Sequence, residues 1–202
     1  MFGVEAVEPW IGPNYGRSEP KVLVVGDSRY SKTYHDRRIV QDQVEGRRDP
    51  VFTKFTQAVI GKQTSAPGYE ADARAFWDGA LFYNYNTTAF PEKAGTPLDS
   101  AARADPQNAR VLQEMVRTFR PTHAIVWGFA NWDSIVQGSS WATLGHIPLE
   151  PPELYRAMLV EGHTVLFAGV LHPSSREFRF ERWAPVLSAF LSVRPESVVG
   201  GA

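Results

Sequence analysis

Polar side chains follow three of four apolar segments of the sequence, at the points where the strands of a parallel sheet would end. Among them are an amide, an imidazole and a carboxylate, which can form hydrogen bonds with a ligand and stabilise charge on it. In open α/β sheets ligands bind beyond the carboxyl ends of the strands, so we expect these side chains to line one crevice. The residues at the four strand ends are Gly26-Asp27-Ser28-Arg29-Tyr30, Asn84-Tyr85-Asn86, Gly128-Phe129 and His172-Pro173-Ser174-Ser175.

The same edge also contains the residue types of a nucleophilic hydrolase. Ser28 or Ser174 could attack a substrate with His172 as the general base, and Asp27 could orient the imidazole. Neither serine lies in the Gly-x-Ser-x-Gly turn that exposes the nucleophile of α/β-hydrolases. A serine-dependent hydrolase of a small molecule is therefore an alternative interpretation of these residues.

Several chemistries are excluded by composition. The sequence contains no Cys, which removes thiol nucleophiles, disulfide bonds and thiolate-held metal clusters. Its five His residues include no pair at the close helical spacing of a zinc site. Neither a phosphate-binding loop nor a dinucleotide fingerprint follows the first predicted strand. We therefore expect no metal and no cofactor.

Length and composition favour one globular domain over residues 1–202, because 43% of the residues are hydrophobic and 21% are charged. No apolar run reaches the roughly 18 residues that a membrane span requires. The first residues lack the positive and apolar regions of a secretory signal, so we expect a cytoplasmic location. The net charge of −1 gives no overall attraction to phosphate, so binding to nucleic acid would need a local basic patch.

Short apolar runs closed by glycine or polar residues predict the buried strands of a parallel sheet. These runs are 21–26, 80–86, 123–128 and 163–169, with an edge strand expected over 155–160. The stretch 27–49 has many charges and no apolar period, so it is predicted to be a long loop, and 139–152 is predicted to be irregular.

Helices are indicated between these strands by caps and by apolar residues at helical spacing. Asp49-Pro50 and Asp105-Pro106 each supply a cap and a first-turn proline, and Phe180 to Leu191 shows the apolar spacing of a C-terminal helix. Strands separated by helices predict an α/β fold with right-handed crossovers. We expect a three-layer sandwich with a central, mainly parallel four-stranded sheet flanked by helices.

Taken together, three of these motifs resemble the uracil-DNA glycosylase superfamily. They are a strand ending in Gly26-Asp27-Ser28-Arg29-Tyr30, a strand ending in Phe82-Tyr83-Asn84, and a late strand followed by His172-Pro173-Ser174. The resemblance covers the expected core, about 21–191, with the motifs in the family's order. The resemblance is closest to a poorly characterised branch with a Gly-Asp/Glu-Ser-x-Tyr first motif. In that branch a Phe and a helix with Arg-Trp follow the third motif, and Phe178 and Arg182-Trp183 follow it in this chain.

This resemblance implies hydrolysis of the N-glycosidic bond of uracil, or of another deaminated or damaged base in DNA, as in DNA repair by base excision. It implies that His172 donates a hydrogen bond to the leaving base and that Asn84 reads the pyrimidine edge. Asp27 or Ser28 would position water or stabilise the sugar cation. The pocket for the base would include Gly26, Tyr30, Pro173 and Ser174.

The resemblance also implies DNA, single- or double-stranded, as the partner of a protein that we expect to be a monomer without membrane contacts. A base in a duplex must be flipped out before it reaches such a pocket, so a wedge is expected after His172, with Arg176 and Phe178 as candidates. Phosphate contacts are expected from cations beside the crevice. The residues expected to bind nucleic acid are Arg29, Lys32, Ser175, Arg176 and Phe178.

The first motif departs from the family at its acid. The best-studied branches have Asp or Asn two positions after the glycine, where this chain has Ser28, and the carboxylate lies one position earlier as Asp27. Serine cannot carry that negative charge. Two interpretations remain: Asp27 has taken over the role of the acid, or the fold is a non-enzymatic module that binds nucleic acid or a nucleobase.

Overall fold

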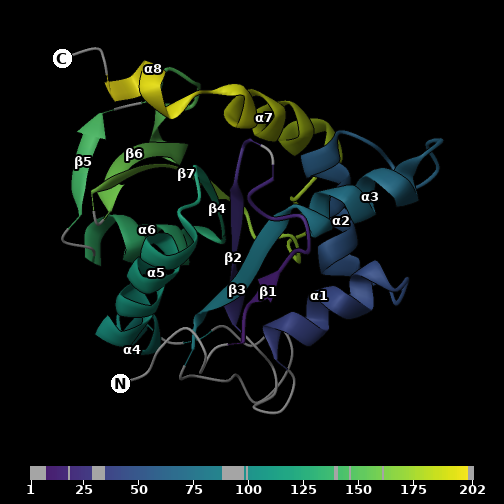
Figure 1. The fold of residues 1–202 in the computed structure, drawn as a ribbon, viewed down its shortest axis with the longest axis horizontal. Coiled ribbons are helices and arrows are strands. Elements are labelled where there is room, and N and C mark those ends of the chain that lie inside the picture. The colour runs from purple at the N-terminus through teal and green to yellow at the C-terminus, as the bar shows by residue number, and fades with distance from the viewer. Residues whose placement is uncertain are drawn as a thin grey trace.

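The computed structural model describes residues 8–17, 19–28, 35–87, 98, 100–138, 141–145, 147–160 and 162–199. Over these residues seven strands form one mixed sheet in the order β1-β3-β2-β4-β7-β6-β5 (Figure 1). The strands are β1 (Trp10–Ile11), β2 (Val22–Ser28), β3 (Ala80–Asn86), β4 (His123–Trp127), β5 (Ala142–Gly145), β6 (Tyr155–Val160) and β7 (His163–Val170).

The predicted α/β class is confirmed, but the prediction of a four-stranded sheet is wrong. The four predicted core strands lie side by side and parallel, as β3-β2-β4-β7. At one edge β1 pairs antiparallel with β3, and at the other β6 pairs antiparallel with β7 and β5 with β6. Two-residue β1 is too short to show a period, and β5 is largely exposed, so neither has the apolar pattern that reveals a core strand. The edge strand expected over 155–160 is β6, and it is not at the edge because it pairs with β7 on one side and with β5 on the other.

Helices connect the strands, and two of them begin as their caps predict. The Asp49 carboxylate accepts hydrogen bonds from the backbone N–H groups of Val51 and Phe52, and the Asp105 carboxylate accepts one from that of Gln107.

The helices are α1 (Asp36–Val44), α2 (Pro50–Ile60), α3 (Tyr69–Asp78), α4 (Ser100–Arg103), α5 (Pro106–Phe119), α6 (Phe129–Gly138), α7 (Phe180–Ser192) and α8 (Pro195–Val199), with a 3₁₀ turn at Pro152–Leu154.

The prediction of a long loop over 27–49 is wrong for much of that segment. Residues 27 and 28 extend β2, and residues 36–44 form α1. Among the apolar residues of α1 only Val40 is fully buried, and most of the rest of the helix is charged or polar. The helix is therefore held by polar contacts of Asp36 as well as by packing, and an apolar period could not reveal it.

Successive residues of the parallel strands point to opposite faces of the sheet, and each face carries its own core. Val22 and Val24 pack with α1, α2, α3 and α7, whereas Leu23 and Val25 pack with α5 and α6. Figure 1 shows these two groups of helices on opposite sides of the sheet. None of the helices described is long and apolar enough to cross a membrane.

Gly169 of β7 allows α6 to approach the sheet, because a Cβ atom there would lie 2.6 Å from the Trp132 ring. We expect Gly169→Ala to lower the free energy of unfolding by about 1–3 kcal/mol, the usual cost of overpacking a core. Gly145→Ala is the matched control, since a Cβ atom at Gly145 meets no atom within 4 Å. Urea denaturation measures both variants, and equal stabilities would contradict this account of the packing.

Candidate functional site

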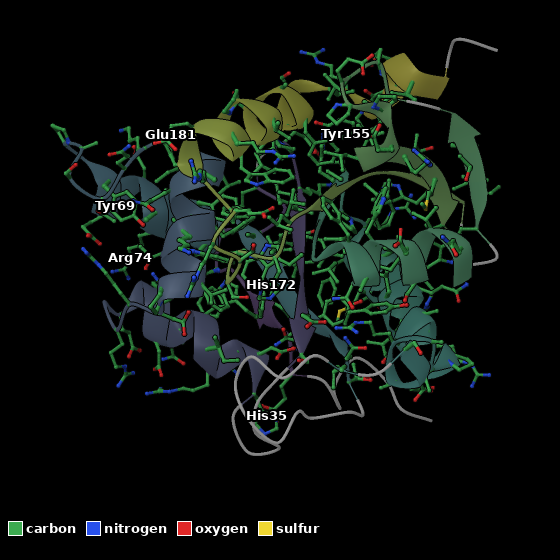
Figure 2. The ribbon with its side chains drawn as sticks, turned by 180° about the vertical axis from the view of Figure 1, so that it is seen from behind. His35, Tyr69, Arg74, Tyr155, His172 and Glu181 are labelled. Carbon is green, nitrogen blue, oxygen red and sulfur yellow. The ribbon has the colours of Figure 1, made fainter. Side chains whose placement is uncertain are left out.

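The carboxyl ends of the four parallel strands bring the predicted polar residues to one edge of the sheet. Gly26 pairs with Asn84 across β2 and β3, and Ser28 pairs with Asn86. His172 follows the end of β7 by two residues, and its ring lies edge-on to Trp127 of β4, with 5.9 Å between ring centroids. Figure 2 shows His172 between the α2 side and the α6 side of the molecule.

Asn84 is held by a buried carboxylate from α1. Asp36 accepts a hydrogen bond from the backbone N–H of Asn84 at 2.8 Å and another from Asn84 Nδ2 at 2.7 Å. A carboxylate that accepts both bonds must face the NH₂ end of the amide, so Asp36 determines which way the amide points. Asn84 Oδ1 then lies over Gly26, where a Cβ atom would be 2.4 Å from it. Glycine at position 26 thus makes room for the oriented amide.

The hydrogen bonds of His172 define which ring nitrogen carries the proton. The backbone N–H of Ser174 donates to His172 Nδ1 at 3.1 Å, and Ser174 Oγ lies 2.7 Å from the same nitrogen. A backbone N–H can only donate, so Nδ1 is an acceptor and Nε2 carries the proton of the neutral ring. Nε2 is therefore the hydrogen-bond donor that His172 can offer to a ligand.

Burial lowers the pKa of His172 below the ordinary value of 6.5, and the positive charge of Arg103 lowers it further, whereas the negative charge of Asp27 raises it. The imidazole is therefore neutral at pH 7. No hydrogen bond between Asp27 and His172 is found among the contacts of the described residues, so the two groups interact through space. Both groups lie at the same edge of the sheet, because Asp27 is near the end of β2 and His172 follows β7.

Asp27 is a partly exposed carboxylate whose two oxygens have different surroundings. Its Oδ1 atom accepts hydrogen bonds from Asn131 Nδ2 at 2.9 Å and from Asn86 Nδ2 at 3.0 Å. Its Oδ2 atom lies 3.8 Å from the guanidinium of Arg103, and its side chain is 26% exposed. One oxygen is thus bound by the protein, and the other lies beside a positive charge.

The remaining predicted site residues lie in the segment after β7 or at the end of β2. Pro173 is buried, Ser175 is half-buried, and Ser174 and Arg176 are exposed, whereas Ser28 is half-buried at the last position of β2. Arg29, Tyr30 and Lys32 lie outside the described residues.

Phe178 does not have the exposure that a DNA wedge needs. Its side chain is only 4% exposed and stacks on Trp183 with ring centroids 5.6 Å apart. The ring packs into the core between the segment after β7 and α7, because this segment turns back toward the sheet at Ser175. Of the two wedge candidates, only Arg176 is exposed.

Four residues at this edge were given no role from the sequence: Asp36, Asn86, Arg103 and Asn131. They lie on α1, β3, α4 and α6, and they act on the predicted residues through hydrogen bonds or charge. Asn86 is the last residue of the predicted strand end Asn84-Tyr85-Asn86, so its position in the sequence already indicated that it lies at this edge. Asn131 follows the Gly128 turn, but Asp36 and Arg103 lie in charged segments where nothing in the sequence separates them from ordinary surface charges.

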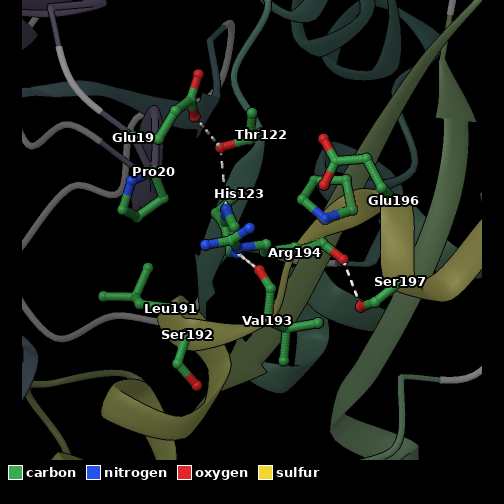
Figure 3. Close-up of a pocket in the computed structure, with 11 residues that line it drawn as sticks. Glu19, Pro20, Thr122, His123, Leu191, Ser192, Val193, Arg194, Glu196 and Ser197 are labelled. Atoms are coloured by element: carbon green, nitrogen blue, oxygen red, sulfur yellow. Dashed lines mark hydrogen bonds between the residues drawn. The ribbon is translucent and has the colours of Figure 1, made fainter.

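A cavity of about 620 Å³ borders this edge between α4, α5 and α6, with Tyr85, Arg103 and Asp105 among its lining residues. A second cavity of about 910 Å³ opens at the opposite end of the sheet, beside the first residues of β4 (Figure 3). There His123 has partners on both ring nitrogens, Thr122 Oγ1 at 3.0 Å and the Val193 carbonyl at 2.9 Å, so its role is structural. Within the described residues, no group of three His, Asp or Glu side chains could hold a metal ion.

Comparison with known protein families gives no match to this chain, and a search of curated proteins gives none either.

Asp36 should contribute strongly to stability because both of its oxygens bind Asn84 inside the protein. In Asp36→Asn only one acceptor oxygen remains for the two donors, so a buried N–H loses its partner, at a cost of about 1–3 kcal/mol. Asp72→Asn is the control, since Asp72 pairs with Lys62 at the surface and such pairs contribute about 0–1 kcal/mol. Chemical denaturation compares the two, and an unchanged midpoint for Asp36→Asn would contradict the proposed anchoring.

Proposed function

We propose that this protein hydrolyses the N-glycosidic bond of uracil, or of another deaminated or damaged base, in DNA. The observation that carries the proposal is the pairing of a neutral imidazole, with its proton on Nε2, and a bound carboxylate, Asp27, at one edge of the sheet. Cleavage of this bond leaves negative charge on the base and positive charge on the sugar. A hydrogen-bond donor and an anion are the two groups that stabilise those charges.

In this proposal each residue has a separate role. His172 Nε2 donates a hydrogen bond to the base oxygen on which negative charge develops. The Asp27 carboxylate stabilises the sugar cation or orients the attacking water. Asn84 reads the base edge from a buried position, since it is only 6% exposed and Asp36 binds one of its amide hydrogens. The base would meet the other hydrogen or Oδ1, in the orientation that Asp36 determines.

The activity can be tested with oligonucleotides, single-stranded and duplex, that carry uracil or hypoxanthine. Base release leaves an abasic site, which alkali cleaves, so strand scission reports the reaction. We expect scission at the modified base only. If stoichiometric protein causes no scission, the proposed activity is wrong, and salt-sensitive DNA binding without scission would instead support a binding module.

His172→Ala should lower the rate of base release by about 100-fold or more, the usual effect of losing a hydrogen-bond donor to an oxyanion. His163→Ala is the matched control, because His163 lies at the opposite end of β7 and its ring binds the Pro121 carbonyl. Single-turnover rates of both variants are compared with the wild type. A His172→Ala variant with the wild-type rate would refute the role of the imidazole.

Arg176 is an exposed cation of the segment after β7 and should contact a DNA phosphate in this proposal. Arg176→Ala should weaken DNA binding for all sequences and reduce the slope of log affinity against log salt by about 1. Arg194→Ala is the control, since Arg194 lines the cavity at the opposite end of the sheet. Fluorescence anisotropy at several salt concentrations measures both, and equal slopes would exclude Arg176 from the interface.

A second candidate is a serine-dependent hydrolase, which is favoured by the distance of 2.7 Å between Ser174 Oγ and His172 Nδ1. This is the spacing of a nucleophile and its general base. It is the weaker candidate because Asp27 does not hydrogen-bond the imidazole. Labelling of the wild type, but not of Ser174→Ala, by a serine-directed phosphonate would support it.

A further inference from the structure

The strand geometry poses a problem for Asp27 as the acid of the site. Along β2, Val22 and Val24 face α1 and α2, whereas Leu23 and Val25 face α5 and α6. By the same alternation position 27 belongs to the second face, where its carboxylate bonds Asn131 of α6, whereas Asn84 bonds Asp36 of α1 on the first face. A carboxylate at position 27 therefore starts on the face opposite Asn84, and it can serve the same ligand only if its neighbours hold it at the edge of the sheet.

We propose that Asn86, Asn131 and Arg103 are positioning residues that hold the Asp27 carboxylate at this edge in a single orientation. This inference rests on the proposed function and extends it. It assigns to these residues, from β3, α6 and α4, the role of holding a carboxylate whose strand position points away from the face of Asn84.

The two amides hold one oxygen of the carboxylate. Both Nδ2 groups donate to Asp27 Oδ1, at 2.9 Å from Asn131 and 3.0 Å from Asn86, and Asn86 Nδ2 also lies 2.8 Å from the backbone carbonyl oxygen of Asp27. The side chains of Asn86 and Asn131 are 0% and 1% exposed, so water does not compete for these bonds.

The orientation of each amide is itself determined by a further hydrogen bond. Asn131 Nδ2 also donates to the Trp127 carbonyl at 3.2 Å, and Asn131 Oδ1 lies 3.2 Å from Asn86 Nδ2. Asn86 Oδ1 in turn accepts a bond from Asn108 Nδ2 at 3.4 Å. Neither amide can turn over without losing a bond inside the protein, so both present N–H groups to the carboxylate.

Arg103 acts on the second oxygen by charge. Its guanidinium lies 3.8 Å from Asp27 Oδ2, which is too far for a direct hydrogen bond, and a second nitrogen donates to the Leu98 carbonyl. Its side chain is only 16% exposed, so solvent screens this charge poorly. Oδ2 is thus stabilised as an anion and accepts no hydrogen bond from the residues that the structure describes, which leaves it as the oxygen that can meet water or the sugar cation.

The first test removes the amide of Asn131 and compares it with a neighbour on the same helix. Asn131→Ala should lower kcat of base release by about 100-fold with KM nearly unchanged, because a small displacement of a reacting group costs that much while binding contacts persist. Ser134→Ala is the matched control, since its hydroxyl donates to the Ala130 carbonyl within α6 and does not bond Asp27. Both are assayed well below their melting temperatures.

The second test needs no catalytic activity, because His172 reports the charges around it. The charged groups that act on it are Asp27 from β2 and Arg103 from α4. NMR titration should show a raised pKa of His172 in Arg103→Gln, an unchanged one in Arg103→Lys, and a lowered one in Asp27→Asn. Asn131→Ala should lower the pKa of His172 as well, because a released carboxylate moves away from the imidazole, whereas a purely structural role for Asn131 would leave the titration unchanged.

The outcomes separate this inference from the proposed function. Wild-type kcat in Asn131→Ala, together with an unaltered His172 titration, overturns the positioning role even if the protein is an active glycosylase. If the wild type releases no base from any oligonucleotide, the proposed function fails, and the His172 titrations alone decide the positioning role: shifts in the stated directions support it and their absence refutes it.

Discussion

Two carboxylates, buried Asp36 of α1 and partly exposed Asp27 of β2, constrain this edge of the sheet, because a carboxylate removed from water needs hydrogen-bond partners. Asp36 meets this constraint by binding Asn84 with both oxygens, and Asp27 meets it through Asn86, Asn131 and the charge of Arg103. These partners come from both helical layers and from the neighbouring strand. The helices are thereby tied to the sheet where the candidate site lies, so stability and site geometry depend on the same bonds.

In the proposed function, the two clusters would serve recognition from one face of the sheet and catalysis from the other. Asp36 approaches from the α1 side and determines the orientation of an amide, whereas Asn131 approaches from the α6 side and holds an acid. Strands β2 and β3 can carry the amide on one face and the acid on the other because successive residues of a strand point to opposite faces. A flat heterocycle above the strand ends would meet the amide from one side and the acid from the other.

The elements of the fold that could be predicted are those marked by residues that are neighbours in the sequence, such as apolar runs and helix caps. Continuous apolar runs identified the four parallel strands, and Asp49-Pro50 and Asp105-Pro106 marked the starts of α2 and α5. Helix α1 was missed because only Val40 of its apolar residues is fully buried, and β5 because its residues are largely exposed. In the site, Asp27 and Asn84 lie near the ends of β2 and β3, and His172 follows β7, so all three could be found from the apolar runs beside them. Asp36 and Arg103 act through contacts 48 residues or more away in sequence, for which no local signal exists.

The aromatic core beneath the site contributes to its chemistry as well as to stability. Trp127 contacts His172 edge-on, and on its other sides it meets Phe52, Phe55 and Phe82 with ring centroids 4.9 to 5.5 Å apart. This cluster removes water from one side of the imidazole, and burial is the largest cause of the lowered pKa of His172. An imidazole that is neutral at pH 7 keeps Nδ1 as an acceptor for Ser174 and Nε2 as a donor. The neutral state of the His172 imidazole, which the proposed chemistry needs, therefore results from the packing of α2 against the sheet.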